Sequence, residues 1–471
     1  MNTAFAQDTG QRLFDTYDTY REASLSHRRF KQKDILPLID GLRADVRFSV
    51  TQVGESVEKR PIQLIKIGNG PRKVLLWSQM HGDEPTATMA LFDLLNWLRR
   101  HDEFDGLRAL LLRETTLYVV PMLNPDGAER YQRRNALDID MNRDALRLQS
   151  PESRILKELQ QTLKPDFGFN LHDQGTRYSA GHSPRQATIS FLATAYDEAR
   201  SINPVRERSM QLIVGMNRVL QRYLPGGVGR YSDEFEPRAF GDNIQKWGTT
   251  LILIESGGYP GDPEKQYIRK MNYVALLTAL EAIATDSYQR ENRAEYGQIP
   301  QNERYLFDVL IRGVRVVRQG KAHTVDVGIN HNEVNVANAT AFQYRSVVDD
   351  LGDLSTFFGI KEIDGRGLTL VPGQVYPQPL DSLAQLQKLN LDSLYRRGVT
   401  TFRLARTVKA PARLPAVQLL QPGTTAARPA QLGQSATFLL KRGKTIRYVF
   451  VNGFWYDLEL QENRLTNGLI D

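Results

Sequence analysis

Cysteine is absent from this 471-residue sequence, and its absence excludes several kinds of chemistry. Such a chain forms no disulfide bonds, has no thiolate nucleophile and cannot bind zinc through sulfur. Any metal site must therefore use its seven histidines and its carboxylates. A protein without cysteine also suits a reducing cytoplasm, so we expect a cytoplasmic location; a leader missing from this sequence would make the protein periplasmic or secreted instead.

Long apolar runs and clusters of basic residues are absent too. A membrane span needs about eighteen consecutive apolar residues. Charged residues interrupt every apolar run before it reaches this length. The net charge is +7, but lysine and arginine are interspersed with aspartate and glutamate along the chain. These features predict a protein with no membrane span and no nucleic-acid partner. No pattern in the sequence indicates an oligomeric state.

Strand-like and helix-like patterns alternate over the first 300 residues. Nearly continuous apolar runs predict strands buried on both faces, over residues 73–79, 115–123, 167–171 and 249–255. Apolar residues at three- and four-residue spacing predict helices, over residues 86–100, 151–163, 205–223 and 264–285. An alternating pattern over residues 47–70 predicts a hairpin of two edge strands. The fold class that follows is α/β, with a mostly parallel mixed sheet flanked by helices and sites beyond the carboxyl ends of its strands.

Three of the predicted strands lead directly to histidine or carboxylate residues. "LWSQMHGDE" places His81 and Glu84 in the turn after one strand, and "FGFNLHD" places His172 at the end of another. Zinc bound by two histidines and one carboxylate, with a fourth position for water, is a common hydrolytic arrangement. "LILIESGG" carries Glu255 out of the most apolar strand, where an acid is costly unless it faces a polar cleft.

Each of these residues taken alone is more often a hydrogen-bonded turn residue than part of a metal site. Their combination changes that interpretation. It predicts one zinc ion per chain, bound by His81, Glu84 and His172, with Glu255 as the base that a metal-bound water needs.

Five motifs resemble, in order, those of the zinc carboxypeptidases related to carboxypeptidase A. They are "HGDE", "NPDG", "DMNR", "NLHD" and "IESGGY", spread over roughly residues 60–290. The resemblance implies a carboxypeptidase-like fold and the same zinc ligands, His81, Glu84 and His172. It implies that Glu255 is the general base and then the acid that protonates the leaving amine.

The resemblance also assigns roles to the loop that contains "DMNR". Arg133 would polarise the scissile carbonyl and stabilise the oxyanion, with Arg134 as its rival. Asn142 and Arg143 would grip the terminal carboxylate of the substrate, and we expect the acids of "DMNRD" to hold Arg143 in place. The family's digestive enzymes have a tyrosine on a mobile loop; here Tyr231 is the only residue offered by the corresponding stretch, and we assign it no role.

The implied activity is that of a zinc metallocarboxypeptidase, which hydrolyses an amide bond adjacent to a free carboxylate in a peptide. The short loop between "NPDG" and "DMNR" is similar to that of bacterial relatives, which leaves an alternative: a zinc amidase or deacylase acting on N-acyl amino acids or cell-wall peptides. An inactive peptide-binding homologue is a third reading. It is disfavoured because a decayed site usually loses a ligand or the glutamate, and none is missing here.

The composition changes near residue 302 to short β-type runs separated by turn residues. We therefore expect a carboxypeptidase-like catalytic domain over residues 1–300 and a β-rich C-terminal domain of unknown role over residues 301–471. The proline- and alanine-rich residues 406–431 predict a loop or extended connector within the second domain. Its His323, His331 and Glu333 are expected to be solvated residues and not a second metal site.

Overall fold

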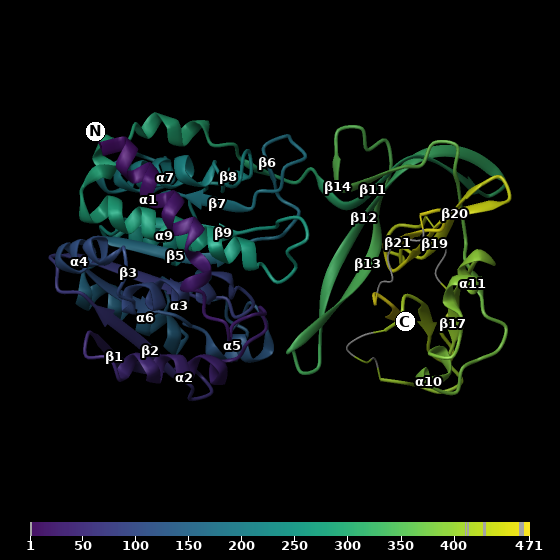
Figure 1. The fold of residues 1–471 in the computed structure, drawn as a ribbon, viewed down its shortest axis with the longest axis horizontal. Coiled ribbons are helices and arrows are strands. Elements are labelled where there is room, and N and C mark those ends of the chain that lie inside the picture. The colour runs from purple at the N-terminus through teal and green to yellow at the C-terminus, as the bar shows by residue number, and fades with distance from the viewer. Residues whose placement is uncertain (1, 410, 412–413, 427–429, 461–465) are drawn as a thin grey trace. The chain divides into compact units, whose positions relative to one another are not determined.

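The computed structural model describes residues 2–409, 411, 414–426, 430–460 and 466–471. The chain divides into two compact units, residues 1–304 and 305–471 (Figure 1). Among the described residues, no helix is both long enough and apolar enough to cross a membrane.

The first unit is built on an eight-stranded mixed sheet with the order β1-β2-β4-β3-β5-β9-β7-β8. The central strands β4, β3, β5 and β9 run parallel to one another, whereas β1, β2 and β7 join them by antiparallel pairing. This confirms the predicted α/β class with a mostly parallel sheet at its centre. The strands are β1 Phe48–Glu55, β2 Pro61–Ile67, β3 Arg72–Ser78, β4 Thr115–Val120, β5 Phe167–Asp173, β7 Ile189–Leu192, β8 Val228–Arg230 and β9 Thr250–Ser256.

The predicted hairpin forms, but only one of its strands lies at an edge. β1 is the outer strand, whereas β2 is hydrogen-bonded on its other side to β4. The prediction of two edge strands was wrong. Alternating apolar and polar residues indicate that one face of a strand is polar, but they do not indicate which strands pair with it. A further pair, β6 Ser179–Ala180 with β10 Asn302–Glu303, forms a small separate sheet.

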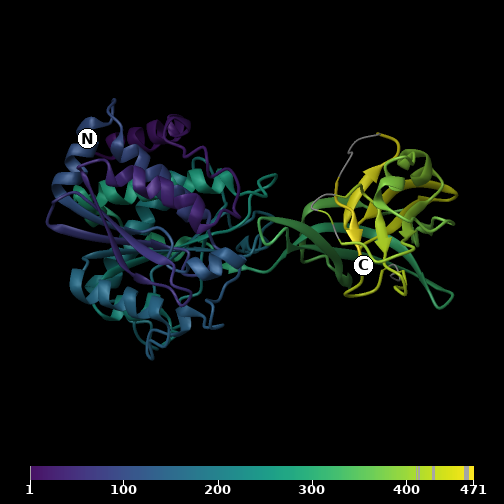
Figure 2. The same cartoon turned by 90° about the horizontal axis from the view of Figure 1, so that it is seen from below.

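Helices cover both faces of the large sheet, as two views of the first unit show (Figures 1 and 2). The four predicted helices are present as α3 Thr86–Arg99, α6 Pro151–Leu163, α7 Pro204–Leu220 and α9 Gln266–Ala284. The sequence patterns did not reveal α1 Asn2–Asp15, α2 Gln32–Arg43, α4 Asp105–Glu114, α5 Pro125–Arg130 and α8 Phe240–Lys246, nor the 3-10 turns η1 Tyr17–Thr19, η2 Met141–Arg143, η3 Ser287–Arg290 and η4 Arg293–Gln298.

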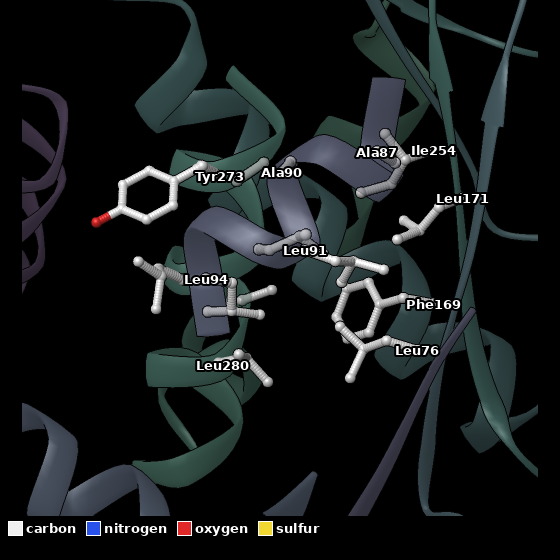
Figure 3. Packing of buried hydrophobic residues seen from close by; sticks show 14 of the residues in the cluster. Leu76, Ala87, Ala90, Leu91, Leu94, Phe169, Leu171, Ile254, Tyr273 and Leu280 are labelled. Carbon is white, nitrogen blue, oxygen red and sulfur yellow. The ribbon is translucent and has the colours of Figure 1, made fainter. Parts of the chain in front are cut away.

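Alternate residues of the central strands divide the core between the two faces. Leu76 and Phe169 pack with α3 and α9 on one face (Figure 3). Leu75, Trp77 and Leu251 pack with residues of α6 and α8 on the other face. Because the strands are fixed on both faces, side chains that follow their carboxyl ends are held in defined positions.

The second unit consists mainly of two further sheets. The larger has the order β13-β12-β11-β15-β19-β20-β21, with β14 beside β11, and the smaller has the order β16-β17-β18-β22. Its elements are β11 Leu306–Arg318, β12 Lys321–Val336, β13 Ala341–Gly352, β14 Phe358–Asp364, β15 Thr369–Val371, β16 Gln374–Val375, α10 Leu383–Leu386, α11 Leu391–Arg396, β17 Val399–Arg403, β18 Gln418–Leu420, β19 Phe438–Arg442, β20 Thr445–Val451, β21 Phe454–Asp457 and β22 Leu469–Ile470.

The stretch over residues 406–431 is not simply a connector. It contains β18, which lies between β17 and β22 and is fully buried. Residues 410, 412–413 and 427–429 of this stretch lie outside the described residues. The prediction failed at β18 because a three-residue strand is too short to show a periodic pattern amid prolines and alanines.

Candidate active site

Three candidate metal ligands come from segments that leave two neighbouring strands. His81 and Glu84 lie in the turn between β3 and α3, and His172 lies near the end of β5. β3 and β5 are parallel neighbours, so their carboxyl ends meet at the same edge of the sheet. All three residues are buried, with exposed fractions of 1%, 7% and 3%. The structure therefore brings the three predicted ligands to one place.

The ligand atoms of these residues converge. Glu84 Oε1 lies 2.8 Å from His81 Nδ1, and Glu84 Oε2 lies 2.7 Å from His172 Nδ1. One ligand atom from each residue lies within 4.8 Å of the others. Burial acts to raise the pKa of Glu84, but the charges of the two histidines outweigh burial and hold this pKa well below its ordinary value. In the part of the chain that the structure describes, no other group of three such side chains is arranged to hold an ion.

Asp140 orients His81 from the side away from Glu84. Asp140 Oδ1 lies 3.1 Å from His81 Nε2. Burial lowers the pKa of His81, but Glu84 and Asp140 raise it more strongly, to about 9. A carboxylate behind a ligating imidazole fixes both its tautomer and its orientation, so Asp140, which the motif "DMNR" contains but which we expected to hold Arg143, supports His81 instead.

Arg133 lies at the site and Arg134 does not. Arg133 Nε donates to Asp140 Oδ2 at 3.0 Å, and Arg133 Nη1 lies 3.3 Å from Glu84 Oε1. Its side chain remains 42% exposed, so the guanidinium also faces the cleft. Arg134 instead donates to the carbonyl oxygen of Asp138 at 2.6 Å. Of the two arginines, only Arg133 is placed to contact a substrate at the metal-ligand cluster.

Glu255 lies on β9 beside His172. The two residues are paired in register across the parallel strands β5 and β9, so both side chains project from the same face of the sheet. Glu255 Oε2 is buried and has no hydrogen-bond partner among the described residues. Burial raises the pKa of Glu255 well above its ordinary value, and the negative charge of Glu84 raises it further.

Asn142 and Arg143 line the same cleft as the ligands. Asn142 Oδ1 accepts a hydrogen bond from the Phe240 backbone N–H at 2.9 Å, which ties the loop to the start of α8. Arg143 Nη1 donates to the Asn142 carbonyl oxygen at 2.6 Å, and Arg143 Nε lies 3.2 Å from Glu236 Oε2. The arginine is therefore held before any ligand arrives.

The acids that flank the Asn-Arg pair do not hold Arg143, contrary to our expectation. Asp140 contacts His81 and Arg133, as described above. Asp144 accepts from the backbone N–H groups of Gln149 and Ser150 at 2.9 Å each. The prediction was wrong because the 3-10 turn η2 directs the two acids away from the arginine between them.

Sequence comparison relates this site to known proteins. The family model described as zinc carboxypeptidase matches residues 38–188, a range that includes His81, Glu84 and His172. Residues 38–188 match a zinc carboxypeptidase domain. The match ends before Glu255, so the predicted base is placed by the fold alone.

Individual relatives of the zinc carboxypeptidase domain are distant. Carboxypeptidase SOL1 of Arabidopsis thaliana is 27% identical over 177 residues, which are 31% of this chain and 36% of the relative. Probable carboxypeptidase 2 of Trichophyton verrucosum is 29% identical over 193 residues, or 39% of this chain and 32% of the relative. The chain thus spans only about a third of the length of these curated relatives. A metallo-carboxypeptidase structure from Burkholderia cenocepacia is similar with 16% identity and a TM-score of 0.45, over 55% of this chain and 70% of that one.

The donor set of the zinc carboxypeptidase domain fits zinc. His81 Nε2 faces Asp140, and its Nδ1 faces Glu84. Both ring nitrogens of His81 therefore face carboxylates, an environment that favours either a protonated imidazole or a metal cation at this position. Zinc prefers two imidazole nitrogens and a carboxylate in this combination, and metal ligands bind in their deprotonated forms.

The "NPDG" motif has a structural function in the zinc carboxypeptidase domain. Asn124 Oδ1 accepts from the Gly127 N–H at 2.8 Å and so begins α5, while Asn124 Nδ2 donates to the Met80 carbonyl oxygen at 3.3 Å. A methyl group on Gly82 would lie 2.0 Å from the Gly127 carbonyl carbon. The two loops are therefore in backbone contact, and this contact positions the turn that carries His81 and Glu84.

The cleft also contains residues to which the sequence analysis assigned no role. The cleft has a volume of about 300 Å³. Besides the residues above, it is lined by Tyr231, Glu234, Glu236 and Asp242. The sequence did not show whether Tyr231 corresponds to the mobile-loop tyrosine of the digestive enzymes. In the structure, its ring centroid lies 6.1 Å from that of Tyr178, in an edge-on arrangement.

Proposed function

We propose that the protein is a zinc metallocarboxypeptidase that hydrolyses the amide bond next to the free terminal carboxylate of a peptide. One observation carries this proposal: a single cleft is lined by the three converging ligands, by Glu255 and by Arg143. The ligands bind the metal at which the bond is cleaved, Glu255 transfers protons and Arg143 binds the terminal carboxylate. One zinc ion per chain follows from the one ligand group found among the described residues.

Glu255 handles the protons in this proposal. Zinc held by His81, Glu84 and His172 supplies a Lewis acid and lowers the pKa of water at the site. Glu255 Oε2, which has no other partner, accepts the proton of the attacking water and passes it to the nitrogen of the leaving amine. The bond formed joins the water oxygen to the carbonyl carbon, and the bond broken is that from the same carbon to nitrogen.

The arginines of the cleft bind the charges of substrate and transition state. Arg133 is fixed by Asp140 and exposes part of its guanidinium, so it donates to the oxygen that becomes negative as the carbonyl is attacked. The planar fork of Arg143 suits a carboxylate. The amide of Asn142 adds a hydrogen bond beside it.

The acids of the cleft favour a substrate whose terminal side chain is basic. The segment from Tyr231 to Asp242 adds Glu234, Glu236 and Asp242 to the lining. Asp242 is only 8% exposed, and burial raises its pKa to about 7. The arginine that acts on this carboxylate, Arg143, is already paired with Glu236. An ammonium or guanidinium group in the cleft would compensate Asp242.

A substrate panel tests the reaction class. The purified protein with stoichiometric zinc would be given blocked dipeptides, the same peptides with an amidated carboxyl end, and N-acyl amino acids. A carboxypeptidase cleaves the free-acid peptides and releases the terminal amino acid. Cleavage of N-acyl amino acids with no cleavage of peptides would replace the proposal by a deacylase, which is the alternative that the short loop suggests.

A further inference from the structure

Lys265 joins the two strand ends that carry His172 and Glu255. Its side chain is almost fully buried, and its Nζ lies 3.0 Å from Asp173 Oδ2 and 2.8 Å from the Ser256 carbonyl oxygen. Asp173 follows His172 on β5, and Ser256 follows Glu255 on β9. A single ammonium group therefore bonds to the residues next to a metal ligand and next to the predicted base.

Asp173 also connects this ion pair to Glu84, another of the proposed zinc ligands. Asp173 Oδ2 also accepts from the Thr86 hydroxyl at 2.6 Å, and the Asp173 backbone N–H donates to Glu84 Oε2 at 3.2 Å. Thr86 opens α3, two residues after Glu84. Asp173 thus joins the segment that begins α3 to the end of β5, and Lys265 joins Asp173 to the end of β9.

The backbone of Lys265 has an uncommon conformation. The residue has a φ of 52°, in the left-handed region, and its backbone precedes α9. A lysine in this region is uncommon and is held there by its surroundings. The Lys265 N–H donates to the Asp262 carbonyl oxygen at 3.1 Å, and the Lys265 carbonyl accepts from the Arg269 N–H at 2.8 Å.

The charge of Lys265 matters because its neighbours are acidic. Asp173, Glu84 and Glu255 all lie at this edge of the sheet, and the negative charges of Glu84 and Asp173 both act on Glu255. A buried carboxylate that loses its cation is strongly unfavourable. Without Lys265, the Asp173 side chain would lose its buried cationic partner and would have to move, which would displace the backbone that presents His172 and supports Glu84.

We propose that Lys265 is a positioning residue for the zinc site and for Glu255, acting through Asp173 and the Ser256 carbonyl. This inference rests on the proposed zinc hydrolase function. It goes beyond that function because Lys265 belongs to none of the five motifs and lies outside the matched residues 38–188.

The test measures zinc affinity by competition with a chelator, and kcat/KM on a peptide that the wild type cleaves. Lys265→Met should weaken zinc binding about tenfold, the lower range for loss of a residue that supports metal ligands, and should lower kcat/KM by at least as much. Asp173→Asn should have an effect of the same kind. The double variant should bind zinc no more weakly than the single variant with the larger loss, because both substitutions remove the same interaction.

Arg269→Met provides the matched control. Arg269 lies on α9, the helix that follows Lys265, and forms a fully buried ion pair with Asp93. Its guanidinium bonds to Asp93 and to the Glu22 carbonyl oxygen instead of to the ends of β5 and β9. At a temperature where all variants are folded, Arg269→Met should keep wild-type zinc affinity. Equal zinc affinity in Lys265→Met and the wild type would overturn the inference, as would equal losses in Lys265→Met and Arg269→Met or strictly additive effects in the double variant. A wild type that binds no zinc and cleaves no peptide would overturn the proposed function itself.

Discussion

His172 and Glu255 lie opposite each other on the adjacent parallel strands β5 and β9. Their side chains project from one face, into the cleft that also contains Arg143. The sheet thus fixes the lateral separation of a ligand and a base that lie 83 positions apart in sequence. Rigid strands are better supports for such a pair than loops, since the backbone on both sides is hydrogen-bonded.

Removing one ligand should remove the metal. We expect His172→Ala to lose stoichiometric zinc, because two ligands remain where a stable site needs three. The measurement is metal content per chain after dialysis. His101→Ala is the control, since the His101 side chain is 79% exposed and lies away from the cleft. Full zinc retention in His172→Ala would show that the metal binds elsewhere.

Replacing the base should separate metal binding from turnover. Glu255→Gln should keep zinc and lose about two to four orders of magnitude in kcat, because glutamine neither accepts nor returns a proton. Single-turnover assays with metal analysis of the same sample would measure both quantities. If the variant retained the wild-type rate, Asp173 and Glu234 would be the next candidates for the base.

The cleft acids should set the side-chain preference. Peptides ending in lysine and in norleucine differ mainly by one charge, so their kcat/KM ratio isolates the effect of that charge, and the Asp242→Asn variant shows the share due to Asp242. We expect the wild type to prefer lysine, and Asp242→Asn to lose most of that preference while its norleucine rate stays nearly unchanged. Glu234→Gln tests whether a more exposed acid is responsible. A wild-type ratio near one, or a loss confined to Glu234→Gln, would contradict the role of Asp242.

Glu281 on α9 should make stability depend on pH. Burial raises its pKa from 4.5 to about 7, while the Thr9 hydroxyl donates to it at 3.3 Å. Because the folded-state pKa is raised, the stabilising contribution is complete below the unfolded pKa of about 4.5 and is lost as the pH rises through 7. Glu281→Gln should therefore increase stability relative to the wild type by ~1–2 kcal/mol more at pH 8 than at pH 5, after allowance for partial exposure.

Thermal or denaturant unfolding at the two pH values measures this difference. Asp197→Asn is a suitable control, because Asp197 is only partly buried and a backbone hydrogen bond from Ser201 lowers its pKa, the opposite direction. An equal effect of Glu281→Gln at pH 5 and pH 8 would show that the carboxyl group is not buried in the folded protein.

The sequence was sufficient to predict which ligand and base candidates lie together in the cleft, but not the contacts that support them. His81, Glu84, His172 and Glu255 could be found because each follows or ends an apolar strand, and parallel strands bring such positions together. Lys265 could not be found in this way, because its partner Asp173 lies 92 positions away. Asp140 was found as part of "DMNR", but its partner His81, 59 positions away, was not. No local pattern encodes those distances.

The Asn142-Arg143 pair, which we call the carboxylate clamp, shows that even contacts of neighbouring residues could not be predicted from the sequence. "DMNRD" contains an acid on each side of its Asn-Arg pair, yet Glu236 is the acid that contacts Arg143. The direction of each side chain in η2 depends on backbone angles that composition does not report. The segment that supplies Glu236 and Asp242 showed no recognisable motif, so the side-chain preference could be argued only from the structure.

The requirement for a free carboxylate is the most direct test of the account. It is measured as kcat/KM for wild type and Arg143→Ala on one peptide with either a free or an amidated carboxyl end. Amidation should cost the wild type about 2–5 kcal/mol in transition-state binding, because Arg143 loses its charged partner. Arg143→Ala should show the same loss on the free acid and little further loss on the amide. Equal wild-type activity on acid and amide would contradict the carboxylate clamp and with it the assignment as a carboxypeptidase.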